Sequence, residues 1–79
     1  MSRREKLLDK MKRTPGMVRY GDVESLLLHE GFVLFNSRGS HRTFHRADGV
    51  VLTVVVPHGR HKTCNPTDIK RILEALGRS

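Results

Sequence analysis

The sequence predicts an α+β fold in which a three-stranded antiparallel sheet carries helices on one face. Apolar residues recur at helical spacing in the first 30 residues and again near the C-terminus. Between these regions lie three short segments rich in valine, phenylalanine and threonine, separated by turn residues. The expected element order is therefore helix, helix, strand, strand, strand, helix. A chain of 79 residues forms one domain with a modest core.

Two helices are predicted before the sheet. Ser2 is the expected N-cap of the first helix. Thr14-Pro15-Gly16 ends it, because proline disfavours helix in the residue before it. The second helix covers residues 20–30, and Gly31 suits the positive φ that follows a helix end. The two apolar stripes consist of Leu7, Leu8 and Met11, and of Tyr20, Val23, Leu26 and Leu27.

The three strands are predicted at residues 32–35, 41–46 and 50–56, with Asn36-Ser37-Arg38-Gly39 as the first turn. A three-residue second loop, with Gly49 in the left-handed region, pairs apolar with apolar and polar with polar residues across the hairpin. This register sets Phe44 opposite Leu52 and Thr43 opposite Thr53. Phe44, Leu52 and Val54 then face the helices, and His41, Thr43 and His45 face solvent.

The last helix has the clearest boundaries. Asn65 is its expected N-cap, and Pro66 stands at the first position, where a missing N–H costs nothing. Asp68 favours the positive end of the helix, and Gly77 ends it.

The charge composition of the chain limits the classes of partner that it is expected to bind. The formal net charge is +7 and the sequence pI is about 10.6, which favours nucleic acid, an anionic membrane surface or an acidic protein. No apolar run approaches the length of a membrane span, and the N-terminus lacks the apolar core of a secretory signal. Cys64 is the only cysteine, so no internal disulfide forms and a reducing cytosol fits the chain.

The most informative motif is Gly39-Ser40-His41, where a glycine-serine turn leads into a histidine at the start of a strand. Histidine takes and gives protons near neutral pH. Metal-independent RNA cleavage needs such a group, together with cations on the developing phosphorane charge. His41 is the candidate catalytic residue. Candidate phosphate-binding groups are Arg38, Arg42 and Lys62, the backbone amides of Gly39 and Ser40, and His58, which is also a candidate second proton-transfer group.

Two alternatives compete with this interpretation. His58, His61 and Cys64 fall at three-residue intervals, a pattern that could serve zinc, although a structural zinc site usually has paired close spacings and more cysteines. We therefore expect no metal and no small-molecule cofactor. The second alternative is a non-catalytic RNA-binding or adaptor domain, in which His41 only contacts sugar or phosphate.

The ordered set of motifs resembles the HicA family of toxins. It comprises Gly39-Ser40-His41, Phe44, Asp48-Gly49, a valine-rich strand closed by Pro57-His58, Lys62, and the helix that starts at Pro66. The resemblance covers about residues 18–77. Many relatives carry a second histidine directly after the first, where this chain has Arg42, and residues 2–14 are an additional N-terminal helix.

The resemblance implies a fold similar to the double-stranded-RNA-binding domain, preceded by an N-terminal extension at residues 1–17, with residues 18–79 forming the HicA-like part of one compact domain. It implies the toxin of a type II toxin–antitoxin system: a metal-independent messenger-RNA endonuclease with His41 as its catalytic histidine. It also implies a HicB-type antitoxin as protein partner. We expect a cytoplasmic protein that binds RNA and no membrane.

Overall fold

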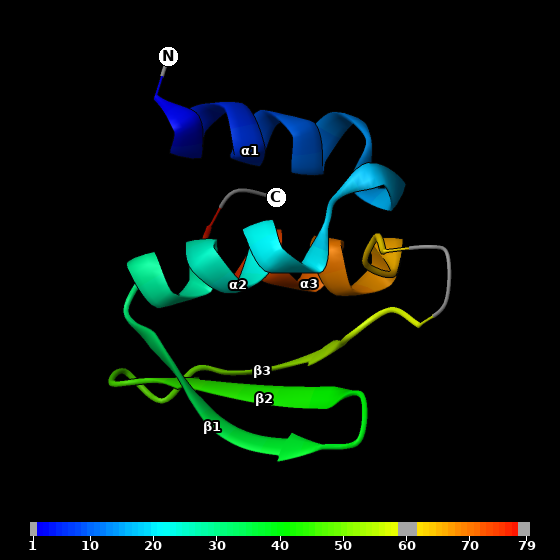
Figure 1. The fold of residues 1–79 in the computed structure, drawn as a ribbon. Coiled ribbons are helices and arrows are strands. Elements are labelled where there is room, and N and C mark those ends of the chain that lie inside the picture. Colours follow the sequence, from blue (N-terminus) through cyan, green and yellow to red (C-terminus); the bar gives the residue numbers. More distant parts are fainter. Residues whose placement is uncertain (1, 59–61, 78–79) are drawn as a thin grey trace.

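The structure, a computed structural model, describes residues 2–58 and 62–77 (Figure 1). Its elements are α1 (Arg3–Arg13), the 3-10 turn η1 (Pro15–Met17), α2 (Tyr20–His29), β1 (Phe32–Arg38), β2 (His41–Arg46), β3 (Val51–Val55) and α3 (Pro66–Ala75). The predicted α+β class and element order are confirmed.

The elements form three layers (Figure 1). The antiparallel sheet has the order β1-β2-β3 and lies on one side. Helices α2 and α3 cover one of its faces, α2 against β1 and α3 against β3. Helix α1 lies on the far side of this helical layer, where it packs against α3 and η1. The opposite face of the sheet, called here the open face, is covered by no element of the described chain.

One core joins all three layers. Phe32, Phe44 and Val54 from the sheet are buried with Leu27 and Ile69 from the helices. Leu8 and Met11 of α1 belong to the same core, so α1 is packed into the domain through its apolar stripe. Within residues 2–58 and 62–77, no helix combines the length and the apolar character needed to cross a membrane.

The predicted helix caps are present. The Ser2 hydroxyl accepts a hydrogen bond from the Glu5 N–H at 3.1 Å. The Asn65 side chain accepts one from the Thr67 N–H at 2.8 Å. Each cap satisfies a backbone donor that has no partner inside its helix.

The register predicted for the second hairpin is confirmed. Phe44 lies opposite Leu52 and Thr43 opposite Thr53. The three-residue loop closes with a hydrogen bond from the Arg46 N–H to the Val50 carbonyl, and Gly49 has a φ of +93°. Burying the apolar face of each strand favours this register, since a slip by one residue would expose Phe44 and Leu52.

The prediction for the first strand is wrong at its C-terminal end. β1 continues to Arg38, and only Gly39 and Ser40 form the turn. A β-bulge at Phe35 shifts the pairing, so that Leu34 lies opposite Phe44 and Asn36 opposite Thr43. Polar residues at 36–38 suggested a turn by local preference. Pairing with the central strand overrides that preference.

Candidate functional site

His41 is the first residue of the central strand and follows a two-residue turn. Gly39 has a φ of +56°, and no other residue from 38 to 41 has a positive φ. This pattern matches a type II′ turn, in which the first loop position favours glycine. The Ser40 carbonyl accepts a hydrogen bond from the Val56 N–H at 2.7 Å, which ties the turn to the segment after β3. The turn therefore holds His41 at a defined place on the edge of the open face.

The neighbours of His41 on the open face follow from the register. Arg38 lies opposite His41 on β1, and Val55 lies opposite it on β3. Directly paired residues share a face of the sheet. The next row along the sheet is Asn36, Thr43 and Thr53. The imidazole of His41 is exposed, and within residues 2–58 and 62–77 it has no hydrogen-bond partner. An exposed histidine with a guanidinium on the facing strand is thus available to a ligand.

Arg42 points to the other face of the sheet, because successive side chains of a strand alternate. Its Nη1 donates to the Gly39 carbonyl at 2.5 Å, so one guanidinium donor braces the turn. The positive charge of Arg42 also acts on the Tyr20 hydroxyl. Burial and the hydrogen bond from the Tyr20 hydroxyl to Glu24 raise the pKa of that phenol, and the positive charge of Arg42 opposes the rise. The structure does not bring Arg42 onto the face that presents His41.

Lys62 lines a cleft on the helical side of this end of the sheet. The cleft also contains Arg19, Tyr20 and Pro57. The backbone of this region is joined by the bond from the Cys64 N–H to the Val18 carbonyl at 2.7 Å. His58 is exposed in the segment after β3, and no hydrogen bond joins it to His41 in the described chain. Lys62 and His58 therefore lie near the His41 end of the sheet, and neither forms a hydrogen bond with the imidazole within the described residues.

The residues considered as zinc ligands differ in burial: His58 is exposed, whereas Cys64 is not. Cys64 is buried in the core, and burial raises the pKa of its thiol to about 11. A protonated, enclosed thiol is a poor metal ligand. Among residues 2–58 and 62–77, no three histidine, cysteine or acidic side chains gather in a metal-binding arrangement. His61 lies outside the described residues.

An aromatic contact on the open face was missed by sequence reasoning. The rings of Phe35 and His45 stack with centroids 4.0 Å apart and planes 9° from parallel. Phe35 is the bulge residue, and 68% of it is exposed. Val33 and Val51 flank His45 on the neighbouring strands. No local signal identified this cluster, because the bulge decides which face Phe35 occupies.

A second missed residue is Asp68. Sequence reasoning assigned it to the positive end of the last helix. It is buried, and its Oδ2 accepts a hydrogen bond from the Val55 N–H at 3.1 Å. Val55 is the strand neighbour of His41. Asp68 thus joins α3 to the end of β3, beside the candidate catalytic residue.

Arg46 lies at the other end of β2 and is already paired. Its Nε and Nη2 donate to the two carboxylate oxygens of Asp48 at 2.9 and 2.8 Å. The guanidinium lies over the ring of Phe32, 4.8 Å from its centroid. The hydrogen bond from Arg46 lowers the pKa of the Asp48 carboxyl. This pair closes the hairpin loop and leaves Arg38 as the arginine next to His41.

The sheet with α2 and α3 on one face is consistent with a double-stranded-RNA-binding-domain-like fold, and α1 is an additional N-terminal helix. The chain belongs to the HicA family: residues 20–77 match the sequence model of this family, described as the HicA toxin of bacterial toxin-antitoxin. The match begins at the first residue of α2, so α1 and η1 lie outside it. No curated protein and no solved structure matches the chain.

Proposed function

We propose that this HicA-family protein is an endoribonuclease that cleaves messenger RNA, with His41 as its acid–base catalyst. The observation that carries the proposal is the placement of His41. It is exposed on the open face, at the end of a glycine-serine turn, with Arg38 on the facing strand. A strongly basic chain supplies the attraction for RNA.

The proposed reaction uses the nucleophile that RNA itself carries. His41 takes the proton of a 2′-hydroxyl as that oxygen attacks the adjacent phosphorus. The bond from phosphorus to the 5′-oxygen breaks, which leaves a 2′,3′-cyclic phosphate and a 5′-hydroxyl. The leaving oxygen takes its proton from solvent or from His58. Arg38 neutralises charge on the phosphorane, while the Gly39 and Ser40 amides and Lys62 bind neighbouring phosphate oxygens. Arg42 supports these groups through its bond to the Gly39 carbonyl.

We further propose that a HicB-type antitoxin silences the protein in the cytoplasm by covering the open face at His41. The charge of Arg38 and Lys62 favours an acidic segment of the antitoxin at this place. Such a segment would exclude RNA and neutralise the local positive charge together.

The experiment is cleavage of a messenger-RNA fragment by the purified chain and its variants. His41→Ala is expected to lower the rate about 10²–10⁴-fold, the usual loss for one acid–base group. Arg38→Gln is expected to lower kcat by about 10²-fold, since it removes one donor to the developing charge. His45→Ala is the matched control: it removes an imidazole from the same strand and the same face, and is expected to cleave at close to the parent rate.

A modified substrate and the end groups of the RNA products test whether the 2′-hydroxyl is the nucleophile, independently of the protein variants. A substrate with a single 2′-deoxynucleotide at the cleavage position is expected to resist cleavage, and the RNA products are expected to carry 2′,3′-cyclic phosphates. In cells, expression of the parent chain alone is expected to arrest growth, and His41→Ala to relieve the arrest. The alternative function is an RNA-binding domain without catalysis. It is supported if both the parent chain and His41→Ala bind the RNA and both leave it intact.

A further inference from the structure

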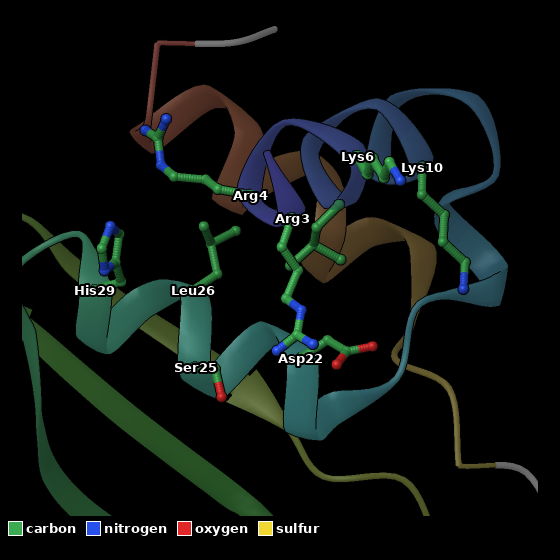
Figure 2. A pocket seen from close by; sticks show the side chains of 9 residues that line it. Arg3, Arg4, Lys6, Lys10, Asp22, Ser25, Leu26 and His29 are labelled. Atoms are coloured by element: carbon green, nitrogen blue, oxygen red, sulfur yellow. The ribbon is translucent and has the colours of Figure 1, made fainter. Parts of the chain in front are cut away.

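A basic groove lies between α1 and α2 (Figure 2). Both helices lie on the side of the sheet away from the open face (Figure 1). Leu7 from α1 and Leu26 from α2 form its apolar floor. Arg3, Lys6 and Lys10 line it from the α1 side. Its volume of about 610 Å³ is in the range of ligand-binding clefts. The family match does not include α1, so this groove is a feature of the additional helix together with α2.

The basic side chains that line the groove from α1 are mostly free of ion pairs within the described residues. Within residues 2–58 and 62–77, Arg3, Lys6 and Lys10 form no ion pair. Figure 2 shows Arg3 extending from α1 toward Asp22 on α2, the one acidic side chain of the groove. Lys6 and Lys10 stand one helical turn apart, so both ammonium groups occur along the same wall.

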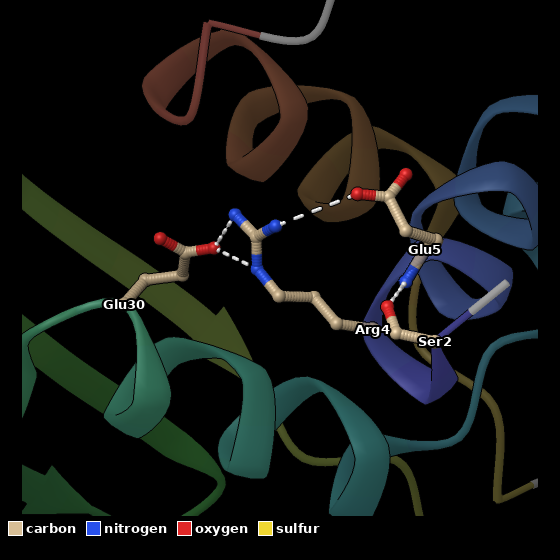
Figure 3. Close-up of polar contacts among 4 residues, drawn as sticks. All are labelled: Ser2, Arg4, Glu5 and Glu30. Atoms are coloured by element: carbon tan, nitrogen blue, oxygen red, sulfur yellow. Dashed lines mark hydrogen bonds and ion pairs between the residues drawn. The ribbon is translucent and has the colours of Figure 1, made fainter.

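Arg4 has a different role. Its guanidinium binds the Glu30 carboxylate at the C-terminal end of α2, and Nη1 lies 3.8 Å from Glu5 (Figure 3). The pair with Glu30 is half-buried and fixes α1 against α2 at one end of the groove. The groove is therefore a preformed feature: its shape is set by this ion pair and by the buried side chains of Leu8 and Met11.

We propose that the α1–α2 groove binds the phosphate backbone of single-stranded RNA, as a second contact region for the substrate of the proposed nuclease. The groove offers three cations that form no ion pair in the described chain, Arg3, Lys6 and Lys10, against a single carboxylate, that of Asp22. Its lining contains no phenylalanine, tyrosine or tryptophan, so it lacks the large aromatic anchor common in protein interfaces, and His29 is the one ring in it. A row of cations along one wall suits a polyanion that is bound without regard to its sequence.

This inference rests on the proposed function, because it takes RNA as the ligand, and it adds a length requirement. The molecule measures 32 × 30 × 18 Å. A stacked strand rises about 3.4 Å per nucleotide, so an RNA on the order of ten nucleotides long spans the whole molecule and can contact both the groove and His41. Much shorter RNAs are expected to bind less tightly, because they cannot occupy both regions together.

The test measures RNA binding by fluorescence anisotropy in the His41→Ala background, where the substrate stays intact. Lys6→Gln/Lys10→Gln is compared with Lys12→Gln/Lys70→Gln. The control pair loses the same charge from exposed positions of α1 and α3 that lie outside the groove. For an RNA of about 15 nucleotides, each lost phosphate contact makes the negative slope of log association constant against log salt shallower by about 0.7. The groove pair is therefore expected to make it shallower by about 1.4. This corresponds to roughly 25-fold weaker binding near 0.1 M salt. The control pair is expected to keep most of the slope.

Three results would overturn the groove proposal. These are an unchanged slope in the groove pair, an equal loss in both pairs, and unchanged RNA binding combined with lost binding of a poly-glutamate peptide, which would assign the groove to an acidic protein. A circular-dichroism melt of each variant confirms that it is folded. The cleavage assay decides the proposed function independently: a parent chain that cuts no RNA refutes the nuclease, whereas the binding slopes still report on the groove.

Discussion

Replacing Asp68 by alanine is predicted to destabilise the domain and to loosen the strand that supports His41. The Asp68 carboxylate accepts the outward-facing N–H of Val55 on the edge strand β3. A hydrogen bond to a charged group contributes about 1.5–3 kcal/mol to the free energy of unfolding. Asp68 also lies in the first turn of α3, where a negative charge contributes about 0.3–1 kcal/mol. The expected loss is therefore about 2–4 kcal/mol.

This loss is large for a chain of 79 residues, whose total stability is about 4–12 kcal/mol. Urea denaturation followed by circular dichroism measures it directly, and Tm is expected to fall by roughly 12–24 °C. Asp68→Asn keeps an acceptor oxygen for the Val55 N–H and is expected to lose less than half as much. If Asp68→Ala unfolds at the parent urea concentration, or if the asparagine variant is as unstable as the alanine variant, the hydrogen bond to β3 is not the source of the stability.

Three further predictions concern cleavage, pH and inhibition. RNA cleavage is expected to persist in excess EDTA, and a loss of activity that zinc or magnesium restores would contradict the metal-independent mechanism. Burial raises the pKa of the Cys64 thiol from its ordinary value of about 9.0 to about 11 in the folded chain. The neutral thiol therefore favours folding below about pH 9, and this contribution, on the order of 3 kcal/mol, is lost as the pH rises toward 11. Urea titrations between these pH values check the loss, and Cys64→Ala is expected to remove that part of the dependence. In a complex with the proposed HicB-type antitoxin, His41 is expected to be protected from imidazole-modifying reagents, and a reactive His41 in a stable complex would place inhibition at another surface.

The sequence alone was sufficient for the features that depend on nearby residues. Ser2 and Asn65 mark the starts of α1 and α3 because a cap acts within one helical turn. The β2–β3 register followed from matching Phe44 with Leu52 over a three-residue loop, since one slip would reverse the buried face. The start of β2 at His41 followed in the same way from the glycine-serine turn before it, while the catalytic role of His41 stays a proposal.

The tertiary structure decided the features that join distant segments. The bulge at Phe35 and the extension of β1 to Arg38 depend on pairing with β2, and they set Phe35 against His45 and Arg38 opposite His41. Residues 36–38 prefer turns locally, so no pattern within that segment predicts the pairing. The bond from Val55 to Asp68 and the groove between α1 and α2 likewise arise where elements meet through packing. Local preferences act over a few residues, whereas these contacts form only when burial of the shared core brings the elements together.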